Sequence, residues 1–210
     1  MRVHLGTFAD PDTIGSEAPD EVIVATGTTP RRDGFQLSTP ATPISGADLP
    51  HVFTSWDIFG FGGRAEINGD CFIFDDTGTF EAISVADALV DAGAKVTMVS
   101  RYDSMGAKIA FPAATVEASK ERLMSGNFDF IGGHYVQGIT PDEVLIGVPF
   151  TERRRAIPAG TVVLVTYNHP NREIAEYAPA GTNVHLIGDV TGTNSIMAAI
   201  HQAAATARAI

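Results

Sequence analysis

Residues 71–100, which read CFIFDDTGTFEAISVADALVDAGAKVTMVS, decide the fold. An apolar run opens this stretch and a second run, 95–100, closes it, and both are typical of strands that are buried on two faces. Between the runs, small and aliphatic side chains recur at the spacing of one helix face, at Ala82, Val85, Ala86 and Leu89. Gly93 then ends the helical pattern. Strand, helix and strand within about 30 residues predict a βαβ unit with a right-handed crossover.

The rest of the chain after this unit alternates between short apolar runs and turn residues. A helix is predicted at 114–124, and the β-branched run at 161–166 is typical of a central strand. Between them, short strands indicate an antiparallel meander, at 128–131, 135–139, 143–148 and 156–157. The last predicted elements are a strand at 184–187 and an alanine-rich helix at about 195–210. The helix residues expected to pack inward are Ser195, Ile196, Ala198, Ala199 and Ala203.

A strand near the start of the sequence lacks obvious neighbours. Residues 21–25 (EVIVA) have the pattern of a fully buried strand, and only one weaker strand, 2–5, precedes them before a turn at 15–20. A buried strand needs neighbours on both sides. We therefore expect its sheet to be completed by later segments, by a partner or by polypeptide outside this sequence. Residues 30–68 are rich in Pro, Gly, Thr and Asp, with a short helix around 55–59, and form the candidate domain boundary.

The composition narrows the class of protein. With 210 residues, 44% of them apolar and 19% charged, the chain has the length of one large or two small domains and is neither disordered nor fibrous. Its 14 basic and 25 acidic residues give a net charge of −11, which repels phosphate backbones and anionic lipid. We therefore expect neither nucleic acid nor a membrane as a partner. A single cysteine, Cys71, and the lack of a signal peptide fit a cytoplasmic location.

Two short motifs follow the strands near the two ends of the sequence. Ala25-Thr26-Gly27 follows the EVIV run, and its small residues let the backbone approach a planar or phosphorylated ligand. Ile187-Gly188-Asp189 closes a strand shortly before a helix. This arrangement presents N–H groups and a carboxylate together, which suits a phosphate and a ribityl or ribose hydroxyl. Taken alone, each motif is better explained as a plain turn.

Together with further segments, these motifs lie in a fixed order around the βαβ unit. The ordered set is 20–32 (DEVIVATGTTPRR), 75–82 (DDTGTFEA), 131–135 (IGGHY), 163–166 with Pro170-Asn171, and 186–189 before 198–201. In this order the sequence resembles, over nearly all of its length, the C-terminal portion of a flavoenzyme family. This is the trimethylamine dehydrogenase, histamine dehydrogenase and 2,4-dienoyl-CoA reductase family, in which an FMN-bearing barrel is joined to two dinucleotide-type domains.

The resemblance implies a fold and a division into domains. The fold is α/β of the FAD/NAD(P)-binding kind, with a three-layer ββα Rossmann-like domain plus a partial second dinucleotide-type domain. The NAD(P)-type Rossmann-like domain is expected at 65–165, and the partial FAD/ADP-type domain at 1–64 and 166–210. The family's barrel, FMN, iron–sulfur cluster and first Gly-rich turn precede the segment seen here. We therefore expect a fragment or truncated product that begins partway through the FAD-type domain.

The resemblance also implies cofactor-binding residues for FAD or ADP. Carried over by position, Ala25, Thr26 and Gly27 line the flavin-type nucleotide site. Gly188 and Asp189 lie beside its pyrophosphate and ribityl part.

In the NAD(P)-type domain the sequence departs from the usual G-x-G-x-x-G turn. The turn reads DDTGTFE at 75–81, so one glycine, Gly78, remains and three carboxylates stand where a diphosphate would rest. Like charges at contact distance cost on the order of several kcal/mol, more than the roughly 0.3–1 kcal/mol that a helix N-terminus returns. Arg101 occupies the place where a 2′-phosphate of NADP would be read, or is a solvated arginine at a strand end. The domain therefore either binds NAD(P) or keeps the fold without a nucleotide.

The functional hypothesis has one alternative. No residue is expected to be a chemical catalyst, and the six histidines have no metal-binding spacing. The hypothesis is a nucleotide-binding and electron-relay fragment, inactive alone, of an FMN-dependent oxidoreductase of amines or enoyl thioesters. Its partners would be the dinucleotide cofactor, the missing barrel region and an electron-transfer partner. The alternative is a non-catalytic, vestigial dinucleotide-fold module that serves as a scaffold or docking surface. An uncovered sheet edge also predicts self-association into a homo-oligomer.

Overall fold

The computed structural model describes residues 2–61, 63, 65–109 and 113–210. The chain divides into two compact units, which we call unit 1 (residues 1–29 and 168–210) and unit 2 (residues 30–167). Residues 30–64, which the sequence assigns to the domain made from the chain ends, fall within unit 2. The two units are described separately below.

Unit 2 is built on a five-stranded parallel sheet. The strand order is β3 (Val52–Phe53), β10 (Thr161–Val165), β4 (Cys71–Asp75), β5 (Val96–Ser100) and β6 (Phe128–Ile131). Every residue of β4 and of β10 is buried, as expected for strands that are covered on both faces. The predicted βαβ unit is present. β4 and β5 are adjacent parallel strands, and one helix joins them along the chain.

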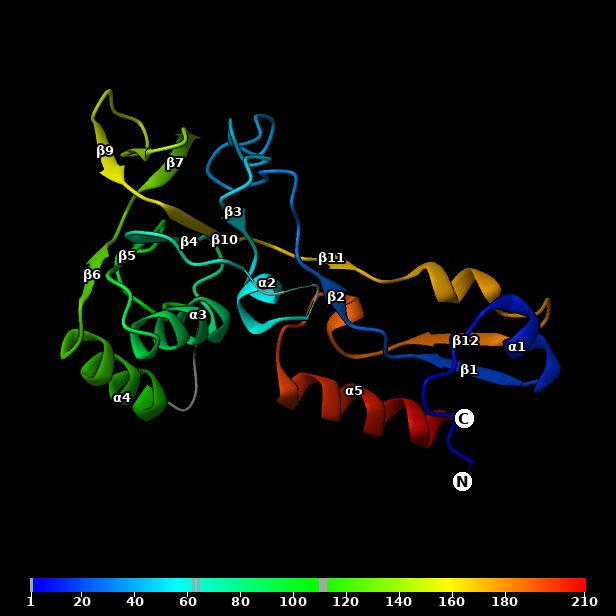
Figure 1. The fold of residues 1–210 in the computed structure, drawn as a ribbon. Helices are drawn as coiled ribbons and strands as arrows, with labels where there is room; N and C mark the ends of the chain where they lie inside the picture. Colours follow the sequence, from blue (N-terminus) through cyan, green and yellow to red (C-terminus); the bar gives the residue numbers. More distant parts are fainter. Residues whose placement is uncertain (1, 62, 64, 110–112) are drawn as a thin grey trace. The chain divides into compact units, whose positions relative to one another are not determined.

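Helices cover one face of this sheet. Helix α3 (Phe80–Asp91) turns Ala82, Val85, Ala86 and Leu89 into the core, as the spacing predicts, and α4 (Ala113–Met124) adds Val116 and Leu123. The sheet contributes the side chains on the same face, such as Ile73 and Met98. Figure 1 shows α3 and α4 side by side below the strands, and the short helix α2 (Ser55–Phe59) beside α3.

An antiparallel meander covers the other face, which makes unit 2 a three-layer ββα domain. The meander consists of β7 (Tyr135–Ile139), β8 (Glu143–Gly147) and β9 (Arg154–Pro158). Its apolar residues pack against Phe72, Phe74 and Leu164 of the parallel sheet. The segment before β3 joins this layer through Gln36, whose buried amide donates to Val136 O at 2.5 Å and accepts from Val136 N at 3.2 Å. This architecture confirms the predicted fold class.

Unit 1 is smaller and holds two strand pairs. β1 (Glu21–Val24) and β12 (Asn183–Leu186) pair in parallel, and β2 (Thr28–Thr29) pairs antiparallel with β11 (His169–Pro170). The helices are α1 (Pro11–Ser16), the 3-10 turns η1 (Glu173–Tyr177) and η2 (Gly188–Thr191), and α5 (Ile196–Ala209). The pairing of β1 with β12 gives β1 one neighbour from a later segment, in a sheet of two strands.

Three sequence expectations about strands are wrong. Residues 2–5 form no strand, and the ordered element before β1 is α1, which Asp10 caps by accepting from Thr13 N at 2.7 Å. β1 is not fully buried, since only Val24 is, and Ile23 is 43% exposed. β6 belongs to the parallel sheet and not to the meander, because a helix precedes it and returns the chain to the edge of β5.

The inward face of α5 is also narrower than predicted. Ala198, Ala199 and Ala203 are half-buried, but Ile196 is 83% exposed. No residue of α5 is fully buried by the part of the chain that the structure describes.

No helix among the described residues is long and apolar enough to span a bilayer.

Candidate functional site

The two predicted flavin-type motifs lie within unit 1, at the same edge of its parallel strand pair. Val24 pairs with Leu186, and Ile187 N donates to Val24 O at 3.0 Å. The residues that follow each strand, 25–27 and 188–189, therefore emerge together at the carboxyl ends of two parallel strands. In open α/β sheets this is the edge where ligands bind.

At this edge Ala25 and Thr26 are exposed, Gly27 is half-buried, and Asn171 holds the segment. Asn171 N donates to Gly27 O at 3.0 Å, its side-chain amide donates to Thr26 O at 3.2 Å, and Thr26 Oγ1 donates to Asn171 O. Asn171 Oδ1 also accepts from Thr29 Oγ1 at 2.9 Å. Asn171 belongs to the ordered motif set, but the sequence alone indicates no role for it. Its four contacts fix the backbone of the motif.

Gly27 leaves open space at the same edge. It has a φ of +69°, which favours glycine, and no described atom lies within 4 Å of the position that a Cβ would take. Ala25 and Thr26 are exposed as well. A planar or phosphorylated group can therefore approach the backbone here, which fits the flavin-type role that the resemblance implies for this segment.

In the second motif, Gly188-Asp189, polar groups already hydrogen-bond within the chain. Gly188 has a φ of +71°, and its N–H already donates to Gln202 Oε1 on α5 at 2.6 Å. Asp189 is half-buried, and its side chain accepts from Thr193 Oγ1 at 3.5 Å. The Asp189 carboxylate thus remains able to accept from a hydroxyl, whereas the Gly188 N–H is engaged within the chain. Gln202 was missed because only the fold brings α5 to η2.

In unit 2 the turn after β4 turns its carboxylates inward. Asp75 and Asp76 have no exposed surface. Asp75 Oδ1 accepts from Gly78 N at 2.7 Å, from Thr77 N at 3.0 Å and from Thr77 Oγ1 at 3.1 Å. Burial raises the pKa of Asp75, and these donors offset part of the rise. Glu81, the third predicted carboxylate, accepts from Ser55 Oγ at 2.5 Å.

Arg101 lies beside this turn, as predicted, but its guanidinium is engaged. Its Nε lies 2.9 Å from Asp76 O and 3.1 Å from Asp76 Oδ1. Its Nη2 donates to the hydroxyl of Tyr102 and lies 3.5 Å from that of Tyr167. Burial raises the pKa of Asp76 to about 6, although Leu37 N–H and Arg101 both favour the ionised form. Gly78 and Arg101 therefore both contact Tyr102, and the guanidinium of Arg101 is engaged within the chain.

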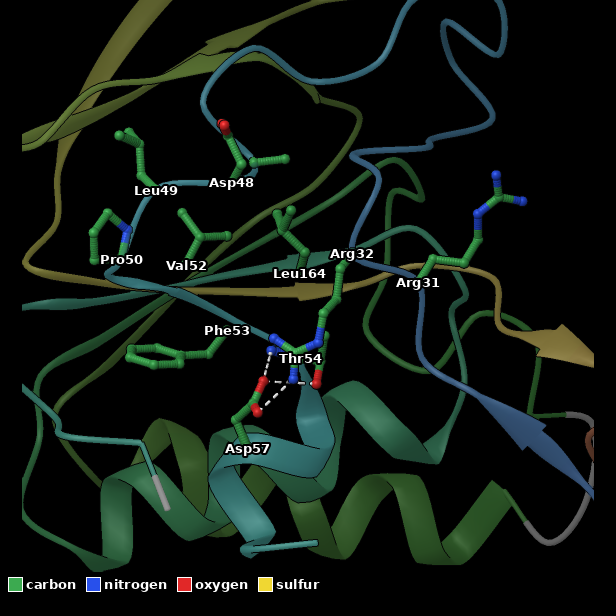
Figure 2. Close-up of a pocket in the computed structure, with 11 residues that line it drawn as sticks. Arg31, Arg32, Asp48, Leu49, Pro50, Val52, Phe53, Thr54, Asp57 and Leu164 are labelled. Carbon is green, nitrogen blue, oxygen red and sulfur yellow. Dashed lines mark hydrogen bonds and ion pairs between the residues drawn. The ribbon is translucent and has the colours of Figure 1, made fainter. Parts of the chain in front are cut away.

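Unit 2 also contains a pocket of about 430 Å³ that no sequence motif predicts. Figure 2 shows the Arg32 side chain directed toward Asp57 and the Arg31 side chain pointing away from it. Arg32 donates to Asp57 Oδ1, and Asp57 Oδ2 accepts from Thr54 N and Thr54 Oγ1. Arg32 pairs with Asp57 at 2.5 Å and Arg31 with Asp33 at 2.5 Å. Burial raises the pKa of Asp57, but the Arg32 and Thr54 donors outweigh it and the net pKa is lowered. Since both arginine charges are already paired, we assign this pocket no ligand.

The lone cysteine and the metal-ligating side chains indicate no further site in the part of the chain that the structure describes. The Cys71 thiol is buried, and burial raises its pKa, which fits the core role given to it by its place in β4. Among the described residues, no cluster of three or more His, Cys, Asp or Glu side chains could hold a metal ion.

Comparison with known proteins places this fold among oxidoreductases. The 6-hydroxypseudooxynicotine amine oxidase HisD from Pseudomonas geniculata N1 matches with a TM-score of 0.85 and 27% identity, over 96% of this chain and 30% of that chain. Histamine dehydrogenase from Rhizobium sp. 4-9 matches with a TM-score of 0.81 and 23% identity, over 95% of this chain and 32% of that chain, a likeness that shows the fold alone. No family model matches the sequence.

A curated relative agrees with these structures. The probable N-methylproline demethylase of Rhizobium meliloti (strain 1021) is 34% identical over 100 residues, which is 48% of this chain and 13% of that protein. The chain thus spans about a third or less of each of these three proteins. The resemblance predicted from the ordered motifs is confirmed.

Proposed function

We propose that this chain, which belongs with the oxidoreductases of the trimethylamine dehydrogenase, histamine dehydrogenase and 2,4-dienoyl-CoA reductase family, is the nucleotide-binding and electron-relay part of a larger FMN-dependent enzyme. One observation carries the proposal. The 25–27 segment, with Ala25 and Thr26 exposed, and the 188–189 turn emerge together at the carboxyl ends of β1 and β12. This edge is where a doubly wound sheet binds a nucleotide.

The residues of this edge have separate roles in the proposal. Gly27 lets the FAD or ADP approach the backbone, and Ala25 and Thr26 line the same side. Asp189 accepts from a ribose or ribityl hydroxyl, and Gly188 supplies the sharp turn that places it. A bound flavin supplies the redox chemistry, and the chain binds and orients it.

The remainder of the parent enzyme completes the proposal. The matched proteins are about three times as long as this chain or longer, which supports a barrel region elsewhere in the parent. We propose that the parent oxidises amines or reduces enoyl thioesters, and the matched amine oxidase, at 27% identity, supports the amine. We place the parent in the cytoplasm, with an electron-transfer partner, and expect this chain to be inactive alone.

Calorimetric titration of the full chain with FAD and with ADP tests the proposed site. We expect heat of binding with at least one of them, and Asp189→Ala should weaken that binding about tenfold, because it removes one charge-assisted hydrogen bond. Asp12→Ala is the matched control, since Asp12 is an exposed carboxylate on α1 of the same unit. An absence of heat with both ligands, or an equal loss in the two variants, would refute the site.

The second candidate function is a non-catalytic scaffold. The inward-facing carboxylates of the 75–78 turn favour it for unit 2, because they leave that turn without the features of a dinucleotide site. The two functions are compatible if unit 1 binds the nucleotide and unit 2 supports it. Titration of the full chain with FAD, ADP, NADH and NADPH separates the two functions, since a pure scaffold takes up none of the four.

A further inference from the structure

A dinucleotide-binding turn needs three features that can be checked in unit 2. Its backbone N–H groups must be free to donate to the pyrophosphate, and space beside its glycine must admit the phosphate oxygens. For NADP, a cation must also be free to pair with the 2′-phosphate. The turn between β4 and α3 has the right place in the fold for all three.

The N–H groups of this turn already have an anionic acceptor. The Asp75 carboxylate, which is fully buried, accepts from Thr77 N at 3.0 Å and from Gly78 N at 2.7 Å through the same oxygen. Its second oxygen accepts from Ser100 Oγ at 3.2 Å. The side chain of the last strand residue therefore occupies the donors that a pyrophosphate would use.

The space beside the glycine is filled by a tyrosine ring. A Cβ built on Gly78 would lie 2.8 Å from Tyr102 Cε2 and 3.2 Å from Lys108 Cγ. Lys108 also closes over the turn through its N–H, which donates to Gly78 O at 2.9 Å. The glycine here makes room for the chain's own side chains, and not for a ligand.

Arg101, the cation that could bind a 2′-phosphate, is also already paired within the chain. Arg101 Nε contacts both the carbonyl and the carboxylate of Asp76, and the guanidinium lies over the Tyr102 ring, 4.3 Å from its centroid. Releasing Arg101 would leave Asp76 ionised without its counter-charge in a fully buried position.

From these three observations we infer that the 75–81 turn is closed by its own side chains, with the Asp75 carboxylate in the place of a pyrophosphate, so that unit 2 does not bind NADH or NADPH. The residues present do not fit the nucleotide that this type of domain carries. Unit 2 is then a folded support, and any nucleotide of this chain binds in unit 1. The inference stands independently of the proposed FAD or ADP site.

Backbone amide NMR of the full chain tests the closed turn directly. We expect 1 mM NADH or NADPH to leave the Thr77 and Gly78 amide signals unshifted and their hydrogen exchange unchanged. Either dinucleotide moving or protecting these amides would overturn the inference. Binding of FAD or ADP to unit 1 would not move them, so a failure of the proposed function gives a different result.

A variant tests whether Asp75 is the group that closes the turn. Asp75→Ala should speed exchange of the Thr77 and Gly78 amides at least tenfold, and sodium formate, which replaces the missing carboxylate, should slow it again. Asp75→Asn is the conservative comparison, because its side-chain oxygen still accepts from both N–H groups and should hold exchange within a few-fold of wild type. Fast exchange in wild type, or no slowing by formate in a folded Asp75→Ala protein, would contradict the assignment. If Asp75→Ala does not fold, the exchange rates in Asp75→Asn and the titration of wild type with NADH and NADPH still test whether the turn is closed.

Discussion

At the scale of single residues, the buried acid Asp76 ties pH to stability. Its pKa is raised to about 6 by burial, with Arg101 and the Leu37 N–H acting in the opposite direction and Asp75 in the same one. A raised pKa means that the folded state holds a proton that the unfolded state has released. The contribution of Asp76 to stability is therefore lost as pH rises from about 4 through 6.

We expect the free energy of unfolding to rise by about 1 kcal/mol from this group as pH falls from 7 to 5. Urea unfolding of wild type and of Asp76→Asn at pH 5, 6 and 7 measures it. The asparagine keeps an acceptor for Leu37 N–H but does not titrate, so its pH slope should be shallower. Some slope should persist, because the pKa of Asp75 is raised too. Equal slopes in the two proteins would contradict the role given to Asp76.

A second prediction at this scale separates backbone strain from close contact at Gly78. Gly78 and Gly93 both have positive φ, +68° and +86°, but only the Cβ built on Gly78 meets other atoms. Alanine at Gly93 should therefore cost about 1–2 kcal/mol from strain alone, and alanine at Gly78 a further 1–3 kcal/mol, roughly, from overpacking against Tyr102. Thermal unfolding of the two variants measures the difference. Equal losses would mean that Tyr102 moves aside freely.

At the scale of elements, one carboxylate of β1 adds side-chain contacts to the parallel pairing with β12. Glu21 accepts from Asn183 Nδ2 at 2.8 Å and lies 2.7 Å from His185 Nε2, both on β12. The hydrogen bond from Asn183, followed by that from His185, lowers the pKa of Glu21. A lowered pKa stabilises the fold above the ordinary pKa of a glutamate, and this stabilisation is lost as pH falls through the lower value.

We therefore expect acid to weaken unit 1, and Glu21→Gln to remove part of that sensitivity. NMR signals of the β12 amides between pH 6 and 3 report the pairing. Glu176→Gln is the control, since Glu176 is exposed on η1 of the same unit. A control that changes the acid response as much as Glu21→Gln would show that the effect is one of net charge.

Elements whose pattern is local were predictable from the sequence, and those set by distant contacts were not. The spacing of Ala82, Val85, Ala86 and Leu89 fixes the buried face of α3, and the structure agrees. The place of β6 depends on pairing with β5, which a run of four residues cannot reveal. In the candidate site, the motif 25–27 was visible as a string of small residues, but the Gln202 contact with Gly188 exists only once α5 has returned to η2.

For the acidic turn at 75–81, the sequence predicts the charges but not the directions of the side chains. The sequence places three carboxylates where a diphosphate would rest, and predicts repulsion from an open turn. The structure turns both carboxylates inward: Asp75 accepts from Thr77 N and Gly78 N, and Asp76 Oδ2 accepts from Leu37 N at 2.8 Å. The obstacle to a ligand is therefore occupation of the N–H groups as well as charge, which depends on side-chain directions that no residue pattern states.

At the scale of the whole molecule, the two units differ in how much apolar surface they bury. The fully buried apolar residues of unit 2 form two clusters, one on each face of the parallel sheet. In the described part of unit 1 only Val24 and Val190 are fully buried apolar residues, while Ile196, Met197 and Ile200 of α5 are more than 60% exposed. Because burial of apolar surface is the main favourable contribution to folding, unit 1 should open at a lower free energy than unit 2.

Native-state hydrogen exchange of the full chain measures this difference. Amides of β4 and β10 should exchange only through global unfolding, whereas those of β1 and β12 should exchange through a separate opening that costs several kcal/mol less, roughly. If a nucleotide binds at the edge of β1 and β12, saturating FAD or ADP should slow exchange in β12 and leave β10 unchanged, because ligand binding stabilises only the unit that holds it. Equal protection in the two units without ligand would contradict the division of the core. Slowing in β10 alone would move the nucleotide to unit 2, against both the site in unit 1 and the closed turn.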